Sequence, residues 1–123
     1  MKTEDLAREV LSKLTDEGRT LATAESCTGG LLGKLLTDVP GASNAYKGGV
    51  ISYVNEVKHR LLGVEQETLD VCTAVSRETA HEMAKGAREA VKADVVLLGD
   101  NLDGRKDYIR DYGYKYLDDI DVS

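Results

Sequence analysis

The feature that most constrains the fold of this chain is a short apolar run that leads directly into a glycine-containing turn and a helical stretch. Residues 20–24 have the composition of a buried strand, residues 25–30 form the turn, and residues 31–37 have apolar side chains at helical spacing. A strand followed at once by a turn and a helix is the start of a β-α unit. We therefore predict an α/β fold.

The rest of the first hundred residues continues this alternation of helix and strand. The pattern predicts helices over residues 3–17, 55–62 and 76–91 and strands over residues 48–54 and 94–98. Asn55 is placed to cap the second of these helices and Ser76 to begin the third. Such an alternation is typical of a layered α/β domain.

The length and composition fit a single soluble domain. The chain has 123 residues, of which 41% are apolar, enough for one modest core. It contains no run near the roughly 18 consecutive apolar residues that a membrane span requires. Residues 1–9 are polar and mixed in charge, which is unlike a signal peptide. We expect a cytoplasmic protein without a membrane partner.

The charge pattern argues against a nucleic-acid partner. The chain has 16 basic and 22 acidic residues, a net charge of −6, and its basic residues do not cluster. Cys27 and Cys72 form neither a disulfide framework nor a metal cluster, and His59 and His81 lack ligands at zinc spacing. Either histidine is an acid–base candidate by chemistry alone, although both lie among charged neighbours typical of a solvated face. We expect no metal and no cofactor.

The turn Ser26, Cys27, Thr28, Gly29 and Gly30 is the strongest local candidate for a binding site. Hydroxyl groups and free backbone N–H groups before a helix favour an anion such as a phosphate. The alternative is a tight turn whose hydroxyls only cap the helix. Cys27 beside a helix start is also a candidate nucleophile, and its alternative is a small buried side chain.

A second candidate constellation is Ser43, Tyr53 and Lys58. A serine needs a base to become a nucleophile, and a lysine serves when burial lowers its pKa. A tyrosine hydroxyl between them can relay the proton or hold the serine. The alternative interpretation is a loop serine, a sheet tyrosine and a surface lysine, which are ordinary residues in such places.

Four segments in this order resemble one family. They are Thr-Ala-Glu-Ser-Cys-Thr-Gly-Gly at 23–30, Pro-Gly-Ala-Ser at 40–43, Tyr-Val-Asn-Glu-Val-Lys at 53–58 and Ala-Val-Ser at 74–76. Together they resemble the C-terminal domain of the competence/damage-inducible protein CinA, over residues 19 to 98. The resemblance implies a three-layer α/β/α sandwich.

Stand-alone members of that family are nicotinamide-nucleotide amidases, so the resemblance implies an activity. It implies hydrolysis of nicotinamide mononucleotide to nicotinic acid mononucleotide and ammonia, a step of pyridine-nucleotide salvage. By resemblance Ser43 is the nucleophile, Lys58 its base and Tyr53 the assisting group, while the turn 26–30 lies on the phosphate or oxyanion side. The alternative function is a non-catalytic nucleotide-binding or assembly module that has lost turnover.

The resemblance stops after residue 98. Family members continue into a Thr-Gly-Ile-Ala-Gly-Pro loop, further strands and a closing helix, whereas residues 100–123 hold seven Asp and four Tyr and match none of this. We therefore expect an incomplete family domain over 1–98 and a divergent acidic tail over 99–123. The tail forms one helix with Tyr108, Tyr112 and Tyr116 on a face, or a partly ordered extension, or a docking element. An uncovered sheet edge would favour a homo-oligomer.

Overall fold

The computed structural model describes residues 3–99, so the expectations for the acidic tail lie outside the described residues. The helices are α1 (Thr3–Glu17), α2 (Leu31–Thr37), the short 3-10 helix η1 (Ala42–Asn44), α3 (Asn55–Leu62), α4 (Gln66–Cys72) and α5 (Arg77–Val91). The strands are β1 (Leu21–Glu25), β2 (Tyr46–Ile51) and β3 (Val95–Gly99).

The three strands form a parallel sheet in the order β2-β1-β3. Glu25, the last residue of β1, lies opposite Ile51 of β2 and Gly99 of β3, so all three strands end at the same edge. We call this the carboxyl edge of the sheet. Every residue of the central strand β1 is buried, which explains why its sequence reads as a continuous rather than an alternating apolar run.

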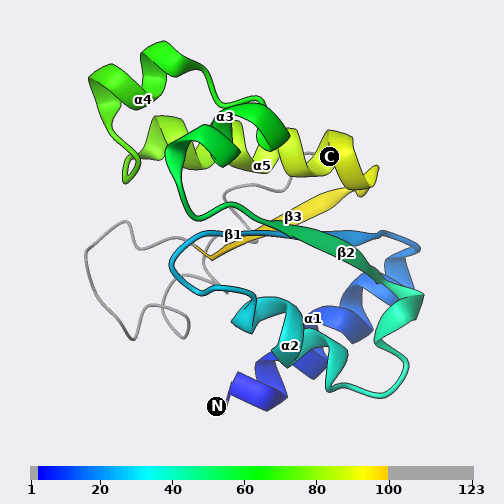
Figure 1. Cartoon of the computed structure of the whole chain (residues 1–123). Helices are drawn as coiled ribbons and strands as arrows, with labels where there is room; N and C mark the ends of the chain where they lie inside the picture. The colour runs from blue at the N-terminus through cyan, green and yellow to red at the C-terminus, as the bar shows by residue number, and fades with distance from the viewer. Residues whose placement is uncertain (1–2, 100–123) are drawn as a thin grey trace.

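Helices cover both faces of the sheet, with α1 and α2 on one side and α3, α4 and α5 on the other (Figure 1). Successive strand residues point to opposite faces. Leu21, Val95 and Leu97 therefore pack against α1 and α2, while Ala22, Ala24, Val96 and Leu98 pack against α3 and α5. The predicted three-layer α/β/α arrangement is confirmed over the described residues.

The helices over residues 3–17, 31–37 and 55–62 have the predicted bounds, and the predicted cap of α5 is present, since Ser76 Oγ accepts the N–H of Thr79 at 3.1 Å. Two predictions were wrong. Strand β2 ends at Ile51 rather than at residue 54, because the chain leaves the sheet there and turns into α3. Helix α3 is preceded by Val54, without a side-chain cap from Asn55.

Helix α4 was not predicted from the sequence. It is one of the shortest helices, and of its seven residues only Leu69 is buried, so it has no apolar stripe to detect. Among the described residues, no helix is long and apolar enough to cross a bilayer.

Candidate functional site

A buried lysine stands at the carboxyl edge of the sheet. Lys58, in the first turns of α3, is only 1% exposed. Its Nζ donates hydrogen bonds to Ser26 Oγ at 3.0 Å, to the carbonyl of Ser52 at 2.8 Å and to the carbonyl of Tyr53 at 3.0 Å. Ser26 is itself 5% exposed. The structure therefore joins a serine hydroxyl and a lysine amine in a site largely closed to water.

The parallel topology explains why these groups meet. Ser26 follows β1 and Ser52 follows β2, and the two strands end at the same edge. The Ser26 N–H donates to the Gly99 carbonyl at 2.8 Å, and the Ser52 N–H donates to the Glu25 carbonyl at 2.7 Å. These bonds continue the sheet by one residue, so the backbone that carries Ser26 is fixed from both sides.

The hydrogen bonds of Lys58 also orient its amine. A neutral amine has two N–H groups and one lone pair arranged about a tetrahedral nitrogen. If the amine is neutral and keeps its two N–H groups on the carbonyls of Ser52 and Tyr53, the position that faces Ser26 Oγ carries the lone pair in place of the N–H that donates there. Burial disfavours the charged form of an amine. The arrangement is therefore suited to removing a proton from Ser26 Oγ.

The start of helix α2 is capped by a buried carboxylate rather than by the hydroxyls of the turn. Glu25 is 2% exposed, and its two oxygens accept the N–H groups of Leu32 at 2.8 Å and Gly33 at 3.1 Å. Gly30, the residue just before the helix, has no side chain that could cap it. The alternative interpretation of the turn, in which its hydroxyls cap the helix, is therefore wrong. Thr28 Oγ1 donates instead to the carbonyl of Gly99 at 3.4 Å.

A tyrosine hydroxyl lies close to the position where this carboxylate meets α2. The hydroxyl of Tyr46 lies 2.8 Å from Thr23 Oγ1, and burial, with a smaller effect from Glu25, raises its pKa although the Thr23 bond lowers it. A Cβ on Gly33 would come within 3.0 Å of the Tyr46 oxygen and 3.4 Å of a Glu25 oxygen. Glycine at this position therefore allows α2 to approach the buried polar groups closely.

The turn between β1 and α2 leaves backbone donors available. Gly29 N–H donates to the Ser26 carbonyl at 3.2 Å, and Leu31 N–H donates to the Thr28 carbonyl at 3.1 Å. Within residues 3–99, the N–H groups of Cys27, Thr28 and Gly30 make no hydrogen bond. Donors of this kind next to a buried serine can hold a negatively charged oxygen.

The structure does not bring Ser43 to Lys58. Ser43 is exposed in η1, before β2, and the hydrogen bond from Leu21 N–H to the Ala45 carbonyl (2.8 Å) places this segment at the start of β1. Lys58 lies at the opposite, carboxyl edge. Tyr53 is brought to Lys58, but through its carbonyl, and as a residue it is 73% exposed.

The other candidates lie in different surroundings. Cys27 is exposed beside Ser26, while burial and the Glu78 carboxylate raise the pKa of the Cys72 thiol. His59 Nδ1 lies 2.7 Å from the Val64 carbonyl. No group of metal-binding side chains was found in the part of the chain that the structure describes.

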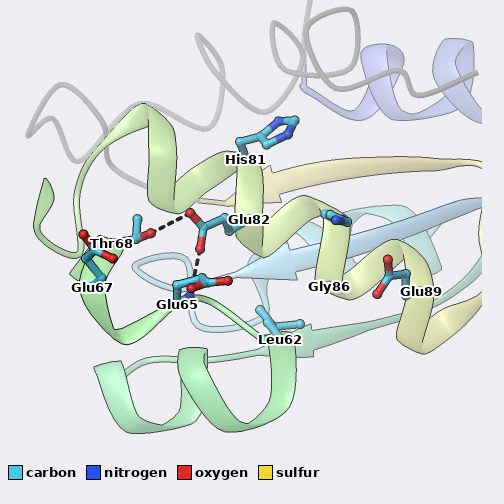
Figure 2. Close-up of a pocket in the computed structure, with 10 residues that line it drawn as sticks. Leu62, Glu65, Glu67, Thr68, His81, Glu82, Gly86 and Glu89 are labelled. Carbon is cyan, nitrogen blue, oxygen red and sulfur yellow. Dashed lines mark hydrogen bonds between the residues drawn. The ribbon is translucent and has the colours of Figure 1, made fainter. Parts of the chain in front are cut away.

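His81 lines a separate pocket between the end of α3, helix α4 and helix α5 (Figure 2). At its centre the Glu82 carboxylate accepts the N–H of Glu65 at 2.8 Å and the hydroxyl of Thr68 at 2.7 Å. These bonds tie Glu65, the residue before α4, and Thr68 of α4 to helix α5. We therefore assign Glu82 a structural part, away from the lysine site.

Sequence reasoning proposed Ser26 and Lys58 separately and missed that they form one pair. Topology was the signal that could have joined them. In a parallel sheet, residues that follow two neighbouring strands lie at the same edge, whereas a residue that precedes a strand, such as Ser43, lies at the other. The capping carboxylate of Glu25 was also missed, although a charged residue that ends a buried strand is itself a signal.

Comparison with known proteins identifies the family. The model of the CinA C-terminal domain matches residues 3–97, and the chain belongs to this family. A competence-damage inducible protein of Caldanaerobacter subterraneus subsp. tengcongensis is 53% identical over 94 residues, which are 76% of this chain and 23% of that protein. The chain thus spans about a quarter of the length of the curated relatives that it matches.

Solved structures show the same fold. The competence/damage inducible protein CihA of Agrobacterium tumefaciens is 42% identical, with a TM-score of 0.75 over 78% of this chain and 58% of that one. The competence or damage-inducible protein of Enterobacter asburiae is 41% identical, with a TM-score of 0.78 over 80% of this chain and 62% of that one.

Proposed function

We propose that this member of the CinA C-terminal domain family hydrolyses the carboxamide of nicotinamide mononucleotide to nicotinic acid mononucleotide and ammonia, with Ser26 as the nucleophile. The observation that carries the proposal is the buried contact of 3.0 Å between Lys58 Nζ and Ser26 Oγ. A serine paired with a desolvated lysine is a known route to an activated hydroxyl. The proposal moves the nucleophile from Ser43, which the resemblance implied, to Ser26.

In the first step Lys58 accepts the Ser26 proton while Ser26 Oγ attacks the carboxamide carbon. The carbonyl oxygen becomes negatively charged in the tetrahedral intermediate. The N–H groups of Cys27 and Thr28 are the nearest backbone donors along the chain and have no other partner among the described residues. We assign them to that oxygen, where one such donor contributes on the order of 10²- to 10³-fold in rate.

In the second step the carbon–nitrogen bond breaks and ammonia leaves, which gives an ester between Ser26 and the nicotinoyl group. Lys58, neutral again after its proton has left with ammonia, removes a proton from a water molecule. The resulting hydroxide attacks the ester and releases the acid, and the proton returns to Ser26 Oγ. The same base thus serves both halves of the reaction.

Ammonia release from nicotinamide mononucleotide by the full chain tests this proposal. We expect Ser26→Ala to lower kcat by at least about 10³-fold, the scale seen when a nucleophile is removed from a catalytic pair. Ser43→Ala and Cys27→Ala distinguish the other candidate nucleophiles, and we expect each to keep most of the wild-type rate.

Two outcomes would overturn the proposal in different ways. Full activity in Ser26→Ala with loss in Ser43→Ala or Cys27→Ala would move the nucleophile to that residue. Mononucleotide binding without any ammonia release from the wild-type chain would favour the non-catalytic binding module instead.

A further inference from the structure

The carbonyl of Gly99, at the end of β3, contacts the turn between β1 and α2 at two places. It accepts the N–H of Ser26 at 2.8 Å and the hydroxyl of Thr28 at 3.4 Å. Ser26 carries the proposed nucleophile, and Thr28 carries one of the N–H groups that we assign to the negatively charged oxygen. One acceptor on a neighbouring strand therefore holds both the nucleophile and an oxyanion donor.

The approach of Thr28 to Gly99 leaves no room for a side chain on the glycine. A Cβ there would lie 2.2 Å from Thr28 Oγ1, 3.0 Å from Thr28 Cγ2 and 3.1 Å from Leu32 Cδ1. Gly99 does not have a positive φ, so its backbone conformation does not by itself call for glycine. Glycine at the end of β3 is therefore explained by the close approach of the Thr28 side chain.

The turn needs a contact of this kind because its second half is made of glycine. Gly29 and Gly30 have φ values of 62° and 108°, and glycine restricts the backbone less than any other residue. The bonds from Gly29 N–H to the Ser26 carbonyl and from Leu31 N–H to the Thr28 carbonyl join the turn only to itself. Among residues 3–99, the Thr28 hydroxyl is what ties the middle of the turn to the sheet.

We propose that Thr28 is a positioning residue whose side chain, held on the Gly99 carbonyl, fixes the direction of the Cys27 and Thr28 N–H groups. It forms no bond to the substrate and transfers no proton. Oxyanion donors act because they are already aimed before charge develops, and a displacement of about 1 Å can lower a rate by about 10²-fold. This inference rests on the proposed amidase function with Ser26 as the nucleophile.

The test is steady-state ammonia release from nicotinamide mononucleotide by the full chain, with the rate of Ser26→Ala subtracted as background. Thr28→Val keeps the shape of the side chain and removes its hydroxyl. We expect kcat to fall by about 10- to 10²-fold and KM to change by less than about threefold, because the charged oxygen exists only after the carboxamide is attacked. We expect Thr28→Ser, which keeps the hydroxyl, to restore most of kcat.

A boronic acid measures the same donors without turnover. Pyridine-3-boronic acid adds to a serine hydroxyl as a tetrahedral, negatively charged adduct, in which one boron-bound oxygen takes the place of the carboxamide oxygen. An inhibitor that resembles the transition state should lose affinity in step with the rate. We therefore expect its inhibition constant to rise in Thr28→Val by about the factor by which kcat falls.

Two further variants examine the contact from outside the turn. Gly99→Ala places a Cβ where Thr28 Oγ1 now lies, so we expect a loss of kcat similar to that of Thr28→Val. Thr37→Val is the matched control, because the hydroxyl of Thr37 at the end of α2 also donates to a backbone carbonyl, that of Lys34 at 3.1 Å. We expect Thr37→Val to keep the wild-type kcat.

The outcomes separate the role of Thr28 from the function on which it rests. A kcat loss in Thr28→Val that Thr28→Ser does not restore, a rise in KM with kcat unchanged, or a wild-type kcat in Gly99→Ala would each overturn the positioning role while the amidase proposal stands. A wild-type chain that releases no ammonia above the Ser26→Ala background would overturn the amidase proposal, and the role of Thr28 with it.

Discussion

Lys58 Nζ lies 3.0 Å from Ser26 Oγ, although the two residues are 32 positions apart in the chain. Ser26 follows one parallel strand and Lys58 lies in the helix that follows its neighbour, so the contact depends on the pairing of β1 with β2. The carbonyls of Ser52 and Tyr53 hold the amine from the other side.

Replacement of both Ser26 and Lys58 should lower kcat by little more than replacement of either residue alone. Ser26 and Lys58 act as a unit in the proposed reaction, so we expect Ser26→Ala, Lys58→Met and the double variant each to lose about 10³-fold or more in kcat. The measurement is steady-state ammonia release by all three variants. Losses that add on a logarithmic scale would show that the two residues act independently.

The stability of the fold should depend on a carboxylate, rather than an amide, at Glu25. In Glu25→Gln, one oxygen still accepts an N–H of α2, but the amide NH₂ group faces the other N–H, donor against donor. We expect a loss of about 1–3 kcal/mol in the free energy of unfolding, the cost of an unsatisfied buried group. Urea unfolding measures it, with Glu9→Gln on the exposed face of α1 as the control. An unchanged midpoint would contradict the capping role.

Replacement of Gly86 by alanine should destabilise the fold because of the close packing of α5 on α3. A Cβ at this position of α5 would lie 1.8 Å from the Leu62 carbonyl oxygen at the end of α3. Helix propensity alone would favour Gly86→Ala by about 1 kcal/mol. We expect the opposite sign, a loss of at least about 1–3 kcal/mol in the free energy of unfolding, because the backbone at Leu62 must move to make room for the Cβ. Lys85→Ala, exposed on the same helix, should be within about 0.5 kcal/mol of the wild type in the same urea titration.

Asp94 should contribute to stability in a pH-dependent way. Hydrogen bonds from the backbone N–H and the hydroxyl of Thr20 lower the pKa of its carboxyl below the ordinary value of 3.8. A lowered folded pKa gives stability that is present above that ordinary value and is lost as the pH falls through the folded value.

Asp94→Asn should therefore unfold at a lower temperature than the wild type at pH 7, and the difference should shrink as the pH falls below about 4. The effect should be small, because the carboxylate is exposed and screened by water. Melting curves across this pH range check it, with the exposed Asp16→Asn as the control. If the difference in unfolding temperature between the wild type and Asp94→Asn grew as the pH fell, the expected direction of the pH dependence would be wrong.

Local patterns in the sequence predicted much of this fold. The stripe of Val10, Leu11 and Leu14 defined α1, and Ser76 marked the start of α5. Runs of β-branched and aliphatic residues located β1 and β3 to within one residue at each end. These features depend on neighbours within a few positions, which a sequence displays directly.

The sequence by itself determined the layered α/β class, the turn at Ser26 and the presence of a lysine that a base would require. Only the tertiary structure decided which serine that lysine meets, because the choice depends on strand order and direction rather than on spacing along the chain. It also decided that Glu25, and not a hydroxyl of the turn, caps α2. The physical reason is that a parallel sheet brings the ends of distant strands to one edge, where contacts form between residues that no local pattern connects.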